Sequence, residues 1–253
     1  MVLLLPLLLA AAPPPPTPIQ RVDRVEPIGW SADRRTVALR VFFGGSYGEA
    51  EPCPGYIDAA GKQFGNGLAI VVLKDGAVLH SLEIQASPMI SHCTPLADAK
   101  KALDAAKKKL EEFGIDRASI GTVLPIAIEK GKATTKKKGE LLVSTWKETW
   151  RAGGAEAPLE IVATLSDSVE EDTYHSAAGS FAWKLRAADG ERTGSIKLGP
   201  VQWSVNMAGG FAWKLFAIAS PGGESIVALI SEDHFNMRGS SSKTTLLPLN
   251  AMK

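Results

Sequence analysis

Short runs of β-branched and aromatic residues, each ended by a turn signal, recur along most of this chain. Three of these runs, residues 37–43, 68–73 and 78–84, follow one another in the first third. Lys74-Asp75-Gly76 between the last two predicts a hairpin, because Asp-Gly tolerates the positive φ angles of a type I′ turn. Hairpins of this kind favour antiparallel meanders over parallel strands joined by helices.

The second half of the chain repeats the pattern. Glycine-containing turns are expected at Gly153-Gly154, Asp189-Gly190 and Pro221-Gly222-Gly223. Around these turns the sequence predicts strands at 141–146, 159–165, 180–185, 195–198, 211–218 and 225–230. Trp146 and Trp150 are interpreted as packing residues, and the acidic run 167–172 as a solvated loop.

One amphipathic helix is predicted at about residues 95–113. Thr94 can cap it, Pro95 suits its first position, and Gly114 ends it. Apolar residues at spacings of three and four form one stripe: Leu96, Ala99, Leu103, Ala106, Leu110 and Phe113. The expected fold class is therefore α+β and mostly β, with blade-like antiparallel meanders in one or two sheets crossed by this helix.

The N-terminus has the pattern of an export signal. Residues 2–12 form an uncharged apolar run that ends in Ala10-Ala11-Ala12, which is too short to span a bilayer and suits a secretory leader. We therefore expect a signal peptide at 1–12, a stiff Pro-rich spacer at 13–20 and a single β-rich domain at 21–253. The expected location is secreted or periplasmic, without a transmembrane anchor.

The two cysteines fit an oxidising compartment. Cys53 and Cys93 both lie in loop-like sequence, and an even pair in an exported chain predicts one disulfide bond between them. Two buried free thiols are the alternative. No Cys or His spacing in the chain is typical of a metal site, and no metal or cofactor is predicted.

Two sequence echoes indicate internal repetition. Gly-Ser-Phe-Ala-Trp-Lys-Leu at 179–185 returns as Gly-Gly-Phe-Ala-Trp-Lys-Leu at 209–215. Alternation places Phe181 and Trp183 on one face of a strand, as it does Phe211 and Trp213, and we expect these four side chains to lie in the core. An aromatic platform for a sugar ring is the alternative.

The second echo links residues 30–39 (WSADRRTVAL) to residues 219–229 (ASPGGESIVAL). Both resemble the turn and following strand of TolB-type β-propeller blades. Together with the leader and the helix, their order also resembles a family of bacterial predicted secreted proteins catalogued as a domain of unknown function. That resemblance implies export and a shared fold, and it implies no reaction.

Charge is balanced over the whole chain and concentrated locally. Lys and Arg number 28 against 27 Asp and Glu, a net charge of +1 that argues against a nucleic-acid partner. Residues 100–138 nevertheless carry ten Lys and one Arg against five acids. Lys136, Lys137 and Lys138, in an expected loop at 130–138, are candidate contacts for anionic lipid headgroups or polyanions, with plain solvation as the alternative.

No catalytic residue is assigned from the sequence. Gly44-Gly45-Ser46-Tyr47-Gly48 matches the nucleophile pattern G-x-S-x-G, but the Pro-rich residues after Gly48 do not predict the helix that this motif needs. We therefore expect a non-enzymatic envelope or extracellular binding protein whose partner is unknown. The alternatives are a serine hydrolase that uses Ser46, and a binder of anionic lipid or glycan.

Overall fold

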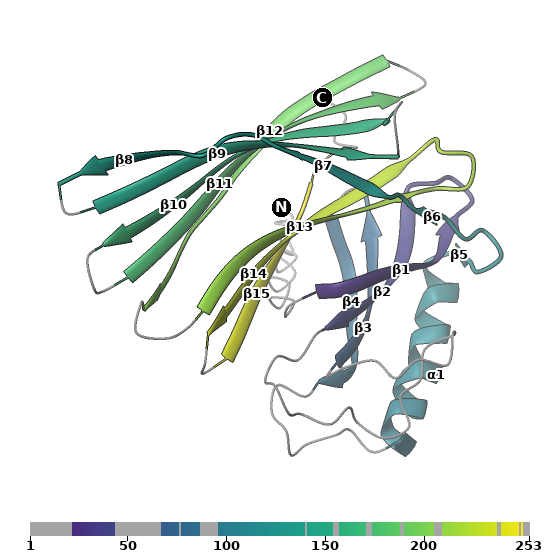
Figure 1. Ribbon diagram of the computed structural model, residues 1–253. Coiled ribbons are helices and arrows are strands. Elements are labelled where there is room, and N and C mark those ends of the chain that lie inside the picture. The colour runs from purple at the N-terminus through teal and green to yellow at the C-terminus, as the bar shows by residue number, and fades with distance from the viewer. Residues whose placement is uncertain are drawn as a thin grey trace, which may run out of the picture.

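The structure is a computed structural model that describes residues 22–43, 67–75, 77–86, 96–139, 141–153, 157–170, 174–187, 190–204, 209–236, 239–247 and 249. Three antiparallel sheets and one helix, α1 (Leu96–Glu112), make up the secondary structure of these residues (Figure 1). The mostly β, α+β class and the antiparallel meanders predicted from the sequence are confirmed. The strands form three sheets, where one or two were expected.

The first sheet has the strand order β4-β3-β2-β1-β5. Its strands are β1 (Val22–Ser31), β2 (Thr36–Phe43), β3 (Gly67–Lys74), β4 (Ala77–Ala86) and β5 (Ile115–Asp116). The third sheet, of order β15-β14-β13-β6, contains β6 (Thr122–Val123), β13 (Gly209–Ala219), β14 (Ile226–Asn236) and β15 (Gly239–Leu246).

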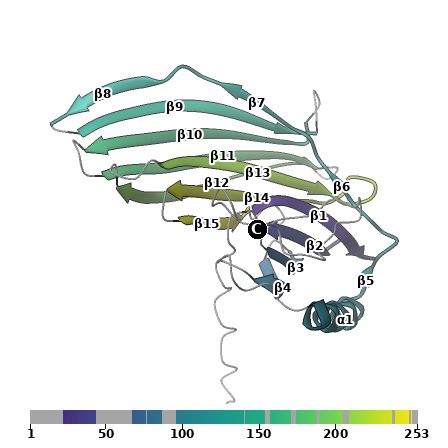
Figure 2. The same ribbon diagram turned by 60° about the horizontal axis from the view of Figure 1, so that its bottom comes forward.

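The second sheet is six-stranded and the largest, with the order β12-β11-β10-β9-β7 and with β8 also paired to β9. It contains β7 (Ile126–Lys130), β8 (Thr134–Lys138), β9 (Leu141–Ala152), β10 (Leu159–Glu170), β11 (Tyr174–Ala187) and β12 (Gly190–Ser204). Its long strands curl over the third sheet (Figures 1 and 2). We call the face of this sheet toward the third sheet its inner face.

The sheets stack in layers, and an apolar cluster fills each space between them. One cluster joins the second and third sheets, another joins the third and first sheets, and a third lies between the first sheet and α1. Strands buried on both faces explain the continuous apolar runs in the sequence. In β2, Val37 and Leu39 contact the third sheet, while Ala38 and Phe42 face the helix.

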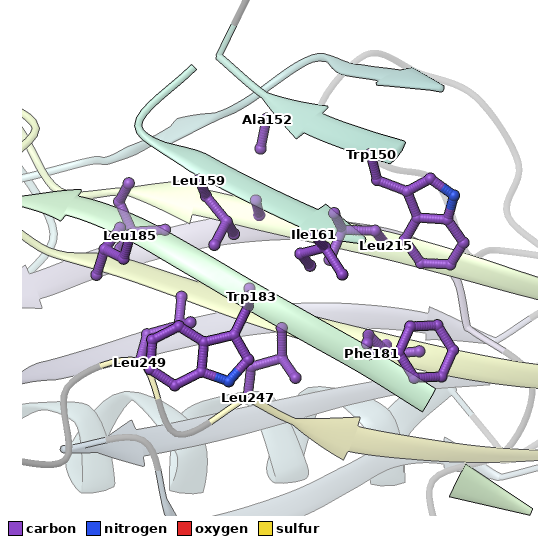
Figure 3. Close-up of a cluster of buried hydrophobic side chains, with 14 of the residues drawn as sticks. Trp150, Ala152, Leu159, Ile161, Phe181, Trp183, Leu185, Leu215, Leu247 and Leu249 are labelled. Atoms are coloured by element: carbon purple, nitrogen blue, oxygen red, sulfur yellow. The ribbon is translucent and has the colours of Figure 1, made fainter. Parts of the chain in front are cut away.

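The predicted aromatic core is confirmed where the side chains are described. Phe181 and Trp183 are buried among Trp150, Leu215 and other residues of the second and third sheets (Figure 3). Trp213 is partly buried against the same cluster, with its ring centroid 5.0 Å from that of Phe181. The two echo strands, β11 and β13, are therefore not hydrogen-bonded neighbours and contact each other across the core. The side chain of Phe211 lies outside the described residues.

The second echo corresponds to the same turn built twice. After β1, the Ser31 carbonyl accepts the Arg34 N–H at 3.0 Å, and the Ser31 hydroxyl accepts the Thr36 N–H at 2.9 Å. After β13, the Ser220 carbonyl accepts the Gly223 N–H at 2.9 Å, and the Ser220 hydroxyl accepts the Ser225 N–H at 3.0 Å.

The backbone conformation of these two turns agrees in part: Gly222 has a positive φ angle of 87°, which its counterpart Asp33 does not share. Arg34 and Gly223 occupy the same position and both have positive φ angles, 58° and 76°. Each hairpin then pairs its first strand with a two-residue strand, β5 on β1 and β6 on β13. The β1–β2 and β13–β14 hairpins are therefore structural equivalents that pack against each other through Trp30, Ile218 and their neighbours.

The helix lies where the sequence predicts it, but its buried stripe is rotated. Ala106 and Leu110 are buried against the first sheet, with Ala102 partly buried beside them, whereas Leu103 is 38% exposed. Small residues at positions 102 and 106 let α1 approach the sheet closely, and this row of i and i+4 positions leaves Leu103 on its flank. Including Leu103 in the stripe was therefore wrong.

Several strand boundaries differ from the predictions. The strands of the second sheet extend well past their predicted apolar segments because their neighbours continue the hydrogen-bonded ladder. Residues 167–170, expected in a loop, belong to β10 for this reason. The sequence did not predict β1, β7, β8 and β15. Pro27 interrupts the strand pattern of β1. The sequence of β15, Gly-Ser-Ser-Ser-Lys-Thr-Thr-Leu, has no clear apolar alternation.

Candidate binding site

The candidate lysines Lys136, Lys137 and Lys138 lie on a strand, and the expected loop at 130–138 is wrong in this part. They belong to β8, which pairs with residues 141–145 of β9 and is exposed along its whole length. β7 pairs only with residues 148–152 of β9, so the backbone of residues 141–145 is free to form hydrogen bonds with residues 134–138. The lysines of α1 lie at the other end of the molecule, so the basic segment 100–138 is divided in two (Figures 1 and 2).

Three other predictions concern residues outside the described parts of the chain. These are the disulfide between Cys53 and Cys93, the Ser46 loop, and the leader and spacer at 1–20. They stay predictions.

A buried carboxylate lies between two tryptophans on the inner face of β9. Glu148 is 9% exposed and accepts the indole N–H of Trp146 at 3.1 Å and that of Trp150 at 2.8 Å. The pleat of the strand causes this arrangement, because residues 146, 148 and 150 alternate to the same face. The tryptophans therefore pack as expected, within one continuous strand, and they also fix the orientation of the carboxylate.

Burial along the inner face falls from one end of the second sheet to the other. Trp150, Ile161 and Phe181 are almost completely buried beneath the third sheet. Toward the far ends of the same strands, Trp146 is only partly buried and Leu142 is 45% exposed. We call this accessible region the open end; on β9, β10 and β11 it comprises Leu142, Ser144, Trp146, Asp167, Val169 and His175.

The open end combines apolar and polar side chains. Nδ1 of His175 lies 3.7 Å from Oδ1 of Asp167, and their side chains are 28% and 36% exposed. Ser144 is opposite Asp167 in the strand register and shares a hydrogen bond of 2.9 Å with the Thr135 hydroxyl. The carboxylate thus lies between serine and histidine, whereas a nucleophilic serine needs the histidine in the middle.

The outer face of the same sheet carries a shallow hollow of about 380 Å³. It lies above Ala182 and Gly194, because these small residues leave space between the larger side chains of β10, β11 and β12. The charged groups beside it already have partners. Glu160 accepts a hydrogen bond from Arg151 at 3.0 Å, and Nζ of Lys184 lies 2.6 Å from Oε2 of Glu191. The carboxylates of Glu129 and Glu160 hold the pKa of Arg151 above its ordinary value.

Within the described residues, no three His, Cys, Asp or Glu side chains gather closely enough to hold a metal ion. In the same part of the chain, no helix has both the length and the apolar character needed to cross a bilayer.

Comparison of the chain with protein-family models, with curated proteins and with solved structures gives no significant match. The function must therefore be argued from the geometry described above.

Sequence reasoning missed the open end and the Glu148 site. A signal for the second was present: Trp-Lys-Glu-Thr-Trp in a strand places two indoles and the carboxylate on one face. The predicted strand ended at Trp146, so Glu148 and Trp150 were not considered as part of the same strand face. The open end had no sequence signal, since it depends on where the third sheet stops covering the second.

Proposed function

We propose that this protein is an exported, non-enzymatic binding protein and that the open end of the second sheet is its binding surface. The observation that carries the proposal is the fall in burial along the inner face. A curled sheet that is closed at one end and accessible at the other presents a concave, partly apolar wall to solvent. Concave surfaces with a few polar groups are the usual sites for small ligands.

The residues of the open end favour an amphipathic ligand. Leu142, Val169 and the half-buried Trp146 offer apolar contact, while the Asp167 and His175 pair gives the surface a polar side. The indole of Trp146 is held in place by Glu148. A preoriented aromatic ring lowers the entropy lost when a ligand binds.

The binding proposal is tested with a neutral amphiphile, octyl glucoside, kept below its critical micelle concentration. Calorimetric titration and tryptophan fluorescence should both report saturable binding to the full chain. Leu142→Asp should weaken it at least tenfold, because it places a charge against the alkyl chain. Val162→Asp is the matched control, since Val162 has a similar exposure of 38% but lies on the outer face of the sheet.

Two results would contradict the proposal. One is the absence of saturable binding to the wild-type chain, and the other is equal weakening by both aspartate variants. Titration with glucose alone separates the amphiphile from a glycan ligand: glucose binding of similar strength would replace the apolar contact with a sugar site at Trp146.

Export and the Cys53–Cys93 disulfide belong to the same proposal. The apolar leader at 2–12 and the paired cysteines support it. Intact-mass measurement of protein from its native compartment should show loss of residues up to 10–12 and a mass two hydrogens below that of the dithiol. A full-length reduced chain in the soluble cytoplasm would contradict export.

The serine hydrolase alternative, with Ser46 as nucleophile, is tested separately. A fluorophosphonate probe should leave the wild-type chain unlabelled if the protein only binds its ligand. Labelling that disappears in Ser46→Ala would make the hydrolase the better interpretation.

A further inference from the structure

Unpaired positive charge collects along one edge of the second sheet. After β7 ends at Lys130, the chain passes Lys132 and returns as β8 with Lys136, Lys137 and Lys138. All five lysines are exposed, and none forms an ion pair among the described residues. We call these five residues the basic edge.

The acidic residues near the basic edge do not neutralise it. Glu129, just before it, forms an ion pair with Arg151 at 3.1 Å. Between residues 130 and 140 the sequence holds five lysines and one acid, Glu140. The local net charge of this segment is therefore four times that of the whole chain, which is +1.

An exposed apolar side chain accompanies the lysines. Lys137 is opposite Leu142 in the strand register, and Leu142 is 45% exposed. Lysine stems and an exposed leucine together suit the boundary between lipid headgroups and acyl chains, where ammonium groups meet phosphates and the leucine contacts the chains. A polynucleotide would satisfy the charges but would leave the leucine without a partner.

Lysines also prevent a free edge strand from pairing with another sheet. Edge protection does not account for the exposed Leu142 beside the lysines. Three consecutive lysines in a pleated strand also place ammonium groups on both faces of the edge.

We propose that the basic edge docks the protein on an anionic membrane surface. Lys136, Lys137 and Lys138 contact lipid phosphates, and Leu142 enters the headgroup layer beside them. Each lysine near such a surface strengthens binding about fivefold at moderate salt. This inference goes beyond the proposed function and does not depend on it: the two share Leu142, but docking is carried by the lysines of β8, which lie outside the open end.

The test is co-sedimentation of the full chain with phosphatidylcholine vesicles that contain or lack 30% phosphatidylglycerol. Binding is expected only to the anionic vesicles, and it should weaken when salt rises from 50 to 500 mM. Replacing Lys136, Lys137 and Lys138 together with Gln should weaken binding about a hundredfold, as three lysines at about fivefold each imply. The control replaces Lys101, Lys107 and Lys108 of α1 with Gln, the same change in charge at the other end of the molecule.

Three outcomes would overturn the inference: no binding of the wild-type chain to anionic vesicles at 50 mM salt, equal losses in both triple variants, or displacement from the vesicles by a single-stranded oligonucleotide at an equal phosphate concentration. An unchanged thermal midpoint verifies that each variant is folded. The β8 variant should keep its octyl glucoside binding, so failure here is distinguishable from failure of the proposed function.

Discussion

Glu148 illustrates how one residue can organise a surface. Its two carboxylate oxygens accept hydrogen bonds from Trp146 and Trp150, which connect the buried core to the open end. Hydrogen bonds to a charged group contribute about 1.5–3 kcal/mol each. We therefore expect Glu148→Leu to lower the free energy of unfolding in urea by about 3 kcal/mol or more, because both indole N–H groups lose their acceptor.

The neighbouring Lys147→Gln serves as the control for Glu148→Leu. Lys147 is exposed on the other face of the same strand, and a change there should stay within about 0.5 kcal/mol. Equal stability of Glu148→Leu and the wild-type chain would show that the carboxylate does not anchor the two tryptophans.

Asp75, in the turn between β3 and β4, gives the fold a dependence on pH through its contact with Arg35 in the β1–β2 turn. Its two oxygens accept hydrogen bonds from Arg35 Nε at 2.8 Å and Nη2 at 2.6 Å, and this contact holds the pKa of Asp75 below its ordinary value. A carboxyl with a lowered pKa stabilises the fold above its unfolded pKa of about 3.9, and this contribution is lost as pH falls through the folded value. The pair is exposed, so the effect is small.

Asp75→Asn should therefore reduce the loss of thermal stability between about pH 4 and pH 2 and leave the rest of the pH profile similar in shape. Asn keeps the positive φ angle of 50° at this position without strain, so the variant removes mainly the charge. An unchanged acid slope in the melting temperature would mean that other carboxyl groups cause it.

At the scale of elements, the repeated serine turn sets the shape of both central hairpins. In each copy the serine hydroxyl accepts the N–H five residues later and so holds the turn together. Ser220→Ala should lower the free energy of unfolding by about 1 kcal/mol. Ser31→Ala should lower it more, because the Ser31 hydroxyl also lies 2.5 Å from an oxygen of Asp33.

Ser195→Ala, on the exposed outer face of β12, is the control for both turns and should have almost no effect in the same urea titration. If Ser31→Ala and Ser220→Ala both matched this control, the equivalence of the two turns would concern backbone shape alone, without a contribution from the hydroxyl.

At the scale of the whole molecule, a short loop at residues 117–121 connects β5 of the first sheet to β6 of the third sheet. A Cβ atom on Gly121 would lie 2.2 Å from the carbonyl oxygen of Ala219 in the third sheet and 2.4 Å from Nε1 of Trp30 in the first. The carbonyl belongs to a paired strand and cannot move away easily. Gly121→Ala should therefore lower the melting temperature and cost about 3 kcal/mol in urea.

Ala118→Val, in the same loop but exposed, is the control for Gly121→Ala and should leave the melting temperature unchanged within a degree or two. Tolerance of Gly121→Ala would mean that the first and third sheets can separate locally without loss of stability, which would contradict their close packing at this point.

The sequence by itself determined the secondary structure that depends on neighbouring residues. Thr94, Pro95 and Gly114 predicted the ends of the helix, Asp75 predicted a tight hairpin, and the echo at Ser31 and Ser220 indicated a repeated turn before its hydrogen bonds were known. These features follow from local backbone preference and apolar alternation, which a single sequence contains.

Only the tertiary structure decided how far the strands extend, how the sheets stack and which surface stays open. β8 is a strand because the edge of β9 offers it hydrogen bonds, and its own residues carry no apolar pattern. Leu142 is accessible because the third sheet does not cover it, whereas Trp150 of the same strand is buried. Pairing across sheets and burial between them depend on residues far apart in the chain, so no local pattern could specify the candidate binding site.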